Sequence, residues 1–145
     1  MLPEAIELSV VTPERQLLHE TVVEVSVPAA RGALGILPGH APLMTELGIG
    51  ELTYRTATSS HPLSLAVIRG FAEVLPGRVT VLAETAERAE EIDLHRAEQA
   101  RARAEKRLAS TDPNLDWDRA IVALERSLIR MQIARKYRGV SVEAH

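Results

Sequence analysis

The chain has 145 residues, 46% of them apolar, with a formal net charge of −3 and no cysteine. Folding at this length buries roughly 70% of the unfolded surface, and the missing cysteines exclude disulfides, thiolate zinc sites and cysteine nucleophiles. The slightly acidic balance disfavours a general nucleic-acid-binding protein, no apolar run approaches the ~18 residues of a membrane-spanning helix, and no signal peptide is expected at the N-terminus.

The content of charged residues, glycine and proline changes near residue 87. Residues 1–86 contain five Lys or Arg and nine Asp or Glu, whereas residues 87–145 contain twelve and eleven. Seven of the eight glycines and seven of the eight prolines precede residue 87. Such a shift in composition predicts two regions with different secondary structure.

The first region has the pattern of short strands. Apolar residues alternate with small or polar ones in residues 6–11, 22–27, 63–68 and 79–83. Turn residues separate such segments, namely Ala30-Arg31-Gly32, Pro38-Gly39 and Pro76-Gly77. Because no long helical pattern lies between them, these strands favour an antiparallel sandwich or flattened barrel over a parallel sheet.

The second region has the pattern of two helices. Residues 93–108 place Ala97, Ala100, Ala104 and Leu108 at helical spacing, and Asp93 is a candidate N-cap. Residues 110–114 break this pattern, and Asp116 is the candidate N-cap of the second helix. The short linker favours an antiparallel hairpin. Its alanine face contributes little apolar burial, so we expect the hairpin to be marginally stable and able to detach.

The second helix carries an apolar stripe that we expect to pack in a core. The stripe consists of Trp117, Ile121, Leu124, Leu128 and Met131. Basic residues follow in the last turn, and Gly139 is the candidate C′ residue at which the helix ends.

Arginines recur on one side of each predicted helix. They are Arg96, Arg103 and Arg107 on the first helix, and Arg119, Arg126 and Arg130 on the second. A solvated helix usually pairs such charges with acids three or four positions away, yet Arg103, Arg126 and Arg130 have no such neighbour. Two interpretations stay open: a basic solvated surface, or a site where an anion such as phosphate receives bidentate guanidinium hydrogen bonds.

Catalytic motifs are absent from the sequence. The chain contains no GxxxxGK[ST] phosphate loop, no HExxH zinc motif and no GxSxG nucleophile motif. The histidines at positions 19, 40, 61, 95 and 145 lack the spacing of metal ligands. We therefore expect neither catalysis nor a metal site from this chain alone.

Several longer motifs occur in a fixed order. They are Val11-Thr12-Pro13-Glu14-Arg15, the segment Gly35-Ile36-Leu37-Pro38-Gly39-His40-Ala41-Pro42-Leu43, residues 69–87, and Ile92-Asp93-Leu94-His95-Arg96-Ala97. Together they resemble the epsilon subunit family of F-type ATP synthases, whose mitochondrial counterpart is called delta. The second motif is similar to the family's hallmark loop, and the last is similar to the [IL]DxxRA motif of bacterial members that bind ATP. The resemblance runs from about residue 5 to residue 137.

The resemblance implies a β-then-α fold. It implies an N-terminal ten-stranded antiparallel β-sandwich over residues 1–86, a C-terminal antiparallel two-helix hairpin over residues 87–139, and a tail over residues 140–145. Residues 83–91 have helical propensity, but the family pattern implies a last strand there that leads into the helices.

The resemblance also implies a non-catalytic subunit of the rotating central stalk, which couples proton-driven rotation to ATP synthesis on the beta subunits. The implied partners are the gamma subunit, the membrane rotor ring of c subunits and, through an extended hairpin, the alpha/beta catalytic head, where the hairpin restrains ATP hydrolysis. The implied location is peripheral, on the cytoplasmic face of the cell membrane, with no nucleic-acid partner.

Site residues follow from the resemblance position by position. The implied ATP-binding residues are Glu87, Asp93, Arg96, Ala97, Arg103, Arg126 and Arg130, and the implied rotor-contact residues are Gly35, Gly39, His40 and Pro42. ATP would be a regulatory ligand rather than a required cofactor, and a magnesium requirement stays open. Ala33 departs from the family, because many members carry an acidic residue there.

Two other classes of function stay open beside this one. The first is a stand-alone β-sandwich binding module that captures a nucleotide or an acidic peptide, and the second is an enzyme. The loop at residues 35–43 and the ordered set of motifs favour the stalk subunit, since a binding module needs neither.

Overall fold

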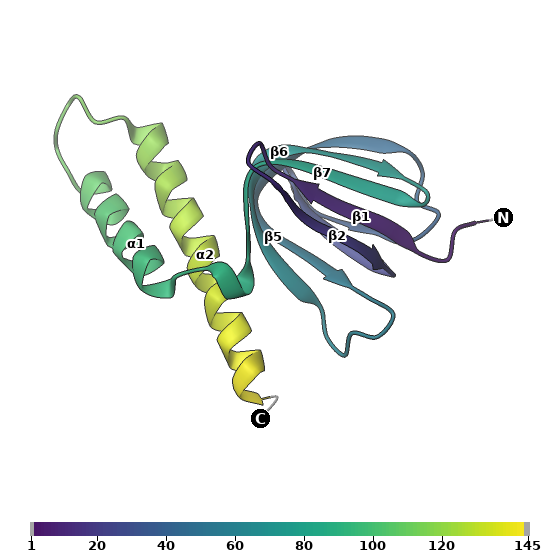
Figure 1. Ribbon diagram of the computed structural model, residues 1–145. Helices are drawn as coiled ribbons and strands as arrows, with labels where there is room; N and C mark the ends of the chain where they lie inside the picture. The colour runs from purple at the N-terminus through teal and green to yellow at the C-terminus, as the bar shows by residue number, and fades with distance from the viewer. Residues whose placement is uncertain (1, 144–145) are drawn as a thin grey trace. The chain divides into compact units, whose positions relative to one another are not determined.

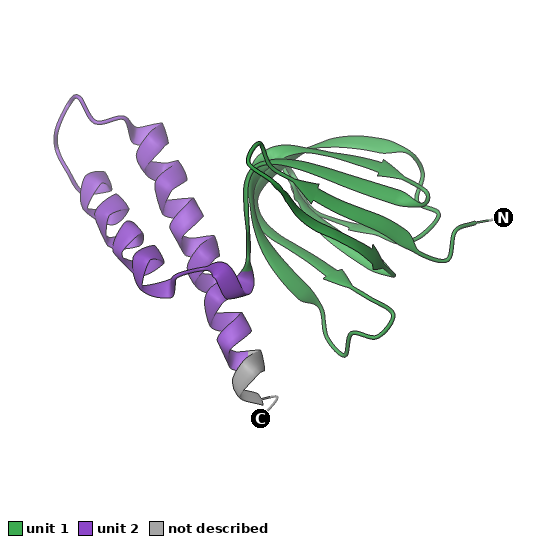
Figure 2. Cartoon of the chain, viewed as in Figure 1, with its two compact units in different colours: residues 1–88 green, residues 89–145 purple. Residues whose placement is uncertain are grey.

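The chain folds into two compact units. The computed structural model describes the backbone of residues 2–143 and the side chains of residues 2–139. The first unit is Met1–Arg88 and the second is Ala89–His145 (Figure 2). The first is built from strands and the second from helices, as the composition of the two regions predicts.

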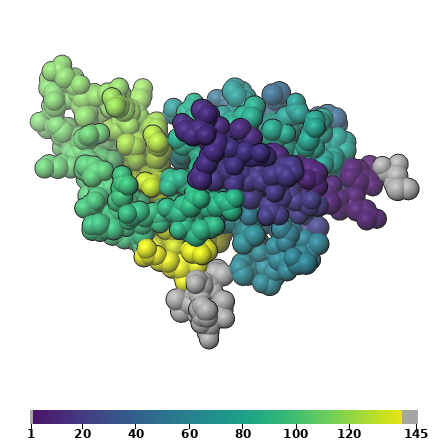
Figure 3. Space-filling model, viewed as in Figure 1, coloured from purple at the N-terminus to yellow at the C-terminus, as the bar shows by residue number. Residues whose placement is uncertain are grey.

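One continuous sheet makes up the first unit (Figure 1). Its strands are β1 (Ile6–Val11), β2 (Gln16–Val22), β3 (Glu24–Ala29), β4 (Gly32–Ile36), β5 (Leu43–Arg55), β6 (Leu63–Leu75) and β7 (Arg78–Arg88). Their order across the sheet is β2-β1-β7-β6-β5-β3-β4. Strands β1 and β2, purple in Figure 3, occupy much of the visible face of this unit.

Strand direction departs from the prediction at one pair of neighbours. Every pair is antiparallel except β1 and β7, which run parallel. The prediction of a purely antiparallel sheet is therefore wrong at this pair. The reason is topological: after the β1–β2 hairpin the chain starts again with β3 near the opposite edge, and successive strands bring it back beside β1.

The long strands bend where their buried face changes. In β6 the buried core residues are Leu65 and Val67 before the bend, and Ala72 and Val74 after it. The positions that belong to the sandwich core thus change from odd to even numbers across Arg69–Gly70. Core residues change in the same way between Leu47 and Leu52 in β5. The register of β6 with β5 and with β7 is the same before and after the bend, so the backbone at the bend lets both halves turn their apolar side to the same interior.

The bend in β6 requires a glycine. Arg69 has φ 55° and Gly70 has φ 131°, a left-handed conformation that side chains other than glycine rarely adopt. A Cβ atom on Gly70 would lie 2.0 Å from the carbonyl oxygen of Leu82. Glycine therefore lets β6 approach β7 closely at the point where the sheet folds over.

The strand count differs from the family expectation. The structure has seven strands in one sheet instead of ten. Strands β5, β6 and β7 have 13, 13 and 11 residues, and each continues through the folded sheet as one strand. The coarser prediction, a β-sandwich followed by two helices, is confirmed.

The structure contradicts one predicted segment and confirms another. Residues 22–27 are not one strand: β2 ends at Val22, β3 begins at Glu24, and the Val23 amide donates to the carbonyl of Arg55 at 2.8 Å. Residues 83–91 follow the family expectation, because β7 continues to Arg88 and leads into the short 3₁₀ helix η1 (Ala89–Glu91).

The second unit is a pair of helices, α1 (Leu94–Leu108) and α2 (Trp117–Glu143). Both predicted N-caps are confirmed. Asp93 Oδ1 accepts from the Arg96 amide at 3.1 Å, and Asp116 Oδ1 accepts from the Arg119 amide at 3.1 Å. These carboxylates accept hydrogen bonds from backbone amides that have no partner inside the helix. Their negative charge also interacts favourably with the positive end of the helix dipole.

Small residues form the seam between α1 and α2, which pack against each other. Ala97 and Ala104 are buried on α1, and Ala120, Ser127 and Ala134 are buried on α2, each seven residues from the next. The expected apolar stripe is therefore wrong in part: Trp117, Ile121 and Leu128 are exposed, and only Met131 of the stripe is buried. Small side chains let two helices approach closely, so the large residues of the stripe lie to one side of the contact.

The predicted end of the second helix is also wrong. Gly139 lies inside α2, which continues to Glu143. Glycine in a helix interior lowers the stability of the helix by only about 1 kcal/mol relative to alanine, so it does not end a helix by itself. The predicted tail at 140–145 is therefore helical through residue 143, and residues 144–145 lie outside the described part of the chain.

Candidate functional sites

The segment that resembles the hallmark loop lies at one end of the sandwich. Gly35 belongs to β4, opposite Ser26 of β3, so only residues 37–42 form the loop before β5. Inside the loop the His40 amide donates to the Leu37 carbonyl at 3.1 Å, and His40 Nδ1 lies 2.7 Å from the Ala41 carbonyl. Pro42 is exposed directly before β5.

Neighbouring segments hold this loop in place. The Gly39 amide donates to the Pro76 carbonyl at 2.8 Å, and Gly39 has φ 88°. A Cβ atom on Gly39 would lie 3.3 Å from the Leu2 side chain. The loop is therefore supported by the β6–β7 turn and by the N-terminal residues, which favours one defined conformation for its exposed side chains. Ala33 lies nearby in β4, exposed and opposite Pro28.

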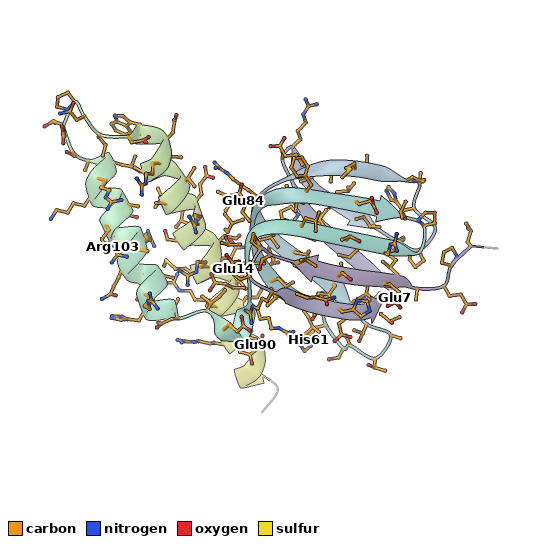
Figure 4. All side chains as sticks on the ribbon, turned by 45° about the horizontal axis from the view of Figure 1, so that its top comes forward. Glu7, Glu14, His61, Glu84, Glu90 and Arg103 are labelled. Atoms are coloured by element: carbon orange, nitrogen blue, oxygen red, sulfur yellow. The ribbon has the colours of Figure 1, made fainter. Side chains whose placement is uncertain are left out.

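The arginine rows of the hairpin lie beside the small-residue seam. Arg96 and Arg103 each precede a buried alanine of α1, and Arg126 precedes the buried Ser127 of α2. A step of one residue turns a side chain by about 100° around a helix. In an antiparallel pair, residues that precede the seam positions of both helices lie on the same side of the hairpin. Arg96, Arg103 and Arg126 therefore lie on one side of the hairpin, with Arg130 one turn further along α2 (Arg103 is labelled in Figure 4).

An ion pair supports this assignment of sides. Glu98 and Arg135 each follow a seam residue, and Arg135 Nη2 lies 3.5 Å from Glu98 Oε1 across the two helices. The residues that follow the seam therefore share one side, and those that precede it share the other. The side that contains Glu98 also presents the exposed Ile121 and Leu128. The hairpin thus has an arginine side and an opposite side with apolar residues.

Acidic partners are unevenly distributed between the two sides. Arg101 Nε pairs with Glu105 Oε1 at 2.7 Å, on the same side as the Glu98–Arg135 pair. Within the described residues, Arg103 and Arg126 form no ion pair, and both are exposed. Arg130 is half-buried, with its Nε atom shielded from solvent. Positive charge therefore accumulates on the arginine side, where an anion would be attracted.

The remaining predicted ATP-site residues have other positions. Asp93 uses its carboxylate as the N-cap of α1, and Ala97 is fully buried in the seam. Ala97 therefore shapes the hairpin through its small size and does not expose its side chain. Glu87 belongs to the first unit, in β7, where it pairs in register with Ala66 of β6.

An apolar surface on the sandwich was missed by sequence reasoning. Phe71 of β6 and Leu82 of β7 are direct cross-strand partners, and both are exposed. Their neighbours Ala72 and Val81 are buried, so strand alternation alone marks positions 71 and 82 as outward-facing. The signal for this surface in the sequence was therefore the presence of large apolar residues at outward-facing strand positions.

Two kinds of feature were not found in the described part of the chain. No group of three or more histidine or acidic residues is placed to hold a metal ion. None of the described helices is both long enough and apolar enough to cross a membrane.

Comparison with protein families matches both units in order. Residues 5–89 match the family described as ATP synthase, Delta/Epsilon chain, beta-sandwich domain. Residues 90–135 match the family described as ATP synthase, Delta/Epsilon chain, long alpha-helix domain.

Similar proteins carry the name ATP synthase epsilon chain. One from Syntrophobacter fumaroxidans is 45% identical over 135 residues, which is 93% of this chain and 99% of the relative. One from Herpetosiphon aurantiacus is 50% identical over 134 residues, which is 92% of this chain and 97% of the relative.

Similar solved structures come from ATP synthase assemblies. A chain in the Euglena gracilis mitochondrial ATP synthase structure, described as OSCP/F1/c-ring, has a TM-score of 0.78 and 25% identity, covering 88% of this chain and 80% of that chain. A chain in the Tetrahymena thermophila central stalk/c-ring structure has a TM-score of 0.64 at 13% identity, a likeness of fold, and covers 89% of this chain and 96% of that one.

Proposed function

The chain belongs to the ATP synthase delta/epsilon family, and from this membership we propose that it is a subunit of the rotating central stalk of an F-type ATP synthase. The subunit is non-catalytic and couples proton-driven rotation of the membrane ring to ATP synthesis elsewhere in the complex. The observation that carries the proposal is the end-to-end match, since both units match the family in order and named epsilon chains align over more than 90% of both sequences.

Three partners are part of the proposal. The sandwich binds the gamma subunit, and its loop with Gly35, Gly39, His40 and Pro42 faces the ring of c subunits. The similar structures, which are an OSCP/F1/c-ring assembly and a central stalk/c-ring assembly, support a place beside the rotor ring. In an extended state the hairpin reaches the alpha/beta catalytic head. The subunit is then peripheral, on the cytoplasmic face of the cell membrane.

Co-purification from the native organism tests this assembly. A tagged full-length chain should recover gamma, alpha, beta and c subunits from detergent-solubilised membranes in one complex. Recovery of the chain alone, while the other subunits assemble into an active synthase without it, would contradict the proposal. That outcome would favour the stand-alone binding module instead.

The hairpin is proposed to restrain ATP hydrolysis. Its seam of small residues buries little apolar surface, so separating the helices from their closed arrangement costs little. Its basic residues then attract an acidic segment of the catalytic head, a contact that salt weakens because the Debye length falls to ~3 Å at 1 M.

Truncation after Arg88 tests this regulation. Arg88 is kept because its Nη2 atom donates to the Leu17 carbonyl at 2.6 Å within the sandwich. The truncated subunit should raise ATP hydrolysis by the complex and leave ATP synthesis coupled. Equal hydrolysis by truncated and full-length complexes, at low and high salt alike, would remove the regulatory role.

ATP is the proposed regulatory ligand of the closed hairpin. The phosphates would lie among Arg96, Arg103, Arg126 and Arg130, which the helical geometry assigns to one side. Opening the hairpin separates these residues, so ATP would bind the closed state more tightly and shift the equilibrium toward it. At 100 times its dissociation constant, ATP would stabilise the closed state by about 2.7 kcal/mol.

A further inference from the structure

The hairpin contains one motif twice. Residues Ile92-Asp93-Leu94-His95-Arg96-Ala97 and Leu115-Asp116-Trp117-Asp118-Arg119-Ala120 share the pattern of an isoleucine or leucine followed by Asp-x-x-Arg-Ala. Each copy begins a helix, because its aspartate accepts from the amide of its arginine at 3.1 Å. Each copy ends in an alanine that is buried in the seam. The two copies therefore have the same local structure and the same position relative to the contact between the helices.

The arginines of the arginine side repeat together with this motif. On each helix three arginines follow one another at spacings of seven and four residues. They are Arg96, Arg103 and Arg107 on α1, and Arg119, Arg126 and Arg130 on α2. Seven and four residues are close to two turns and one turn of an α-helix, so each set lies along one side of its helix. In both sets the first two members directly precede a residue of the seam, which places both sets on the arginine side.

The opposite directions of α1 and α2 give the arginine side an approximate two-fold symmetry (Figure 1). The ion pair between Glu98 and Arg135 fixes the shift between the helices and brings Arg103 within about one turn of the level of Arg126. These two arginines form the centre. On either side of them, each end of the row receives one further arginine from each helix.

The proposed ATP site uses only one of these ends. It takes Arg96 and Arg130 with the central pair and leaves out Arg107 and Arg119, which lie toward the loop between the helices. Both are exposed and form no ion pair within the described residues. The only acidic residue three or four positions from either is Asp116, whose carboxylate caps α2. Positive charge at the loop end is therefore not neutralised by neighbouring acids.

We infer that the arginine side binds a linear phosphate chain longer than a triphosphate, and that inorganic polyphosphate is a second ligand of the closed hairpin. This inference deepens the proposed function, since it extends the proposed ATP site to the loop end. Arg103 and Arg126 hold the middle of the chain, and the two equivalent ends of the row hold its two equivalent ends.

The chemistry and the length of the row favour this ligand. Guanidinium groups form bidentate hydrogen bonds with phosphate oxygens, and every unit of a polyphosphate presents such oxygens. Arg96 and Arg107 are eleven residues apart in sequence, which corresponds to about 16 Å along α1. A triphosphate is shorter than this row, so it leaves one end of the row unoccupied.

The test is calorimetric titration of the full-length chain with linear polyphosphates of increasing length, starting from tripolyphosphate. Chains that span the row should bind at least ~10-fold more tightly than tripolyphosphate, because they gain charge-assisted hydrogen bonds at the second end. The Arg107→Ala/Arg119→Ala variant should lose this gain. A gain of the same size in the variant would overturn the inference.

The matched control separates the arginine side from overall charge. Arg101→Ala/Arg135→Ala lowers the net charge by the same amount but changes the opposite side of the hairpin, where both arginines belong to ion pairs. This control should keep the gain with chain length. A glutamate polymer of matched charge should bind at least ~10-fold more weakly than polyphosphate, and equal binding would overturn the inference, because the row would then accept any polyanion.

Competition with ATP distinguishes this inference from the proposed ATP site. Polyphosphate should displace ATP, because both ligands use Arg103 and Arg126. Simultaneous binding of both ligands, or of two ATP molecules per chain, would overturn the inference. If polyphosphate binds as expected and ATP does not, the ATP site fails and the inference stands. If ATP binds and longer chains bind no more tightly than tripolyphosphate, the inference alone is wrong.

Discussion

The sandwich and the hairpin bury their side chains in opposite ways. The sandwich encloses large residues such as Ile6, Leu52 and Leu65, which are almost completely buried. The hairpin seam is made of alanines and one serine, and α2 also buries Met131 and Ile133, while Trp117 and Leu128 are exposed. Full burial of a leucine or valine contributes about 1.5–3 kcal/mol, against about 0.8 kcal/mol for a methyl-sized group.

This difference indicates that the sandwich contributes more to the stability of the chain than the hairpin does. The sandwich has a core of large side chains, whereas the two helices meet along a seam of small ones, which the proposed regulation would need to separate. A stable platform joined to a weakly held pair of helices is the arrangement that a conformational regulator needs, because only the weak unit must change state.

The largest effect on stability is expected from replacing the glycine at the bend of β6. Gly70→Ala places a methyl group where its Cβ atom meets the Leu82 carbonyl, at a φ that alanine avoids. We expect a loss of about 4 kcal/mol in the free energy of unfolding, from backbone strain and overpacking together. Chemical denaturation measures it. Gly35→Ala is the control, because nothing lies within 4 Å of its Cβ position, and it should cost less than ~0.5 kcal/mol.

The next prediction compares the loss of one leucine side chain in each unit. Leu65→Ala in the sandwich core should cost about 3 kcal/mol, since a cavity remains where the side chain was. Leu128→Ala on the exposed side of α2 should cost less than ~0.5 kcal/mol. Denaturation midpoints measured by circular dichroism check both. Equal losses for the two variants would contradict the contrast between the units.

The arginine side of the hairpin supplies the third test. Arg126→Ala/Arg130→Ala should weaken ATP binding at least ~100-fold, or about 2.7 kcal/mol, because charge-assisted hydrogen bonds contribute about 1.5–3 kcal/mol each. The control Arg101→Ala/Arg135→Ala removes two arginines from the opposite side and should leave ATP affinity within about three-fold. Calorimetric titration is the measurement. No binding by wild type at millimolar ATP would refute the ATP site and leave the stalk assignment standing.

The smallest effect concerns a helix cap. Asp116→Ala removes the carboxylate that accepts from the Arg119 amide and should destabilise the hairpin by about 1 kcal/mol. Asp116→Asn keeps an acceptor and should behave like wild type. Hydrogen exchange should become faster in the first turns of α2 and stay unchanged in β1 and β7. Faster exchange throughout both units would mean that the hairpin and the sandwich unfold together.

Local signals predicted much of the fold. The N-caps Asp93 and Asp116 act within three residues of their own position, so the sequence alone located the starts of both helices. The strand β1 was predicted with its observed ends for the same reason, because alternation is a local property. Strands β2, β4 and β5 were not singled out, and β5 contains two glycines and mixed polar residues that obscure its alternation.

The candidate sites were predictable only in part. The loop at 35–43 and the arginine rows were visible as motifs, and the structure shows how Pro76 and Leu2 support the loop. The exposure of Phe71 and Leu82 could have been predicted from strand alternation, but their proximity could not, because the two become neighbours only through the register of β6 against β7. The expected core role of Trp117 and Leu128 failed for a similar reason, since an amphipathic stripe does not say whether a partner covers it.

The sequence alone was enough to predict a strand region followed by a helical region, the division near residue 87, the helix starts and the family, because each depends on neighbouring residues or on ordered motifs. Only the tertiary structure shows that β1 pairs in parallel with β7, that the core-facing side of β6 changes at Gly70, and that small residues form the seam between the helices. These features depend on contacts between residues far apart in the chain. Side-chain periodicity defines the faces of an element, and only packing decides which face is covered.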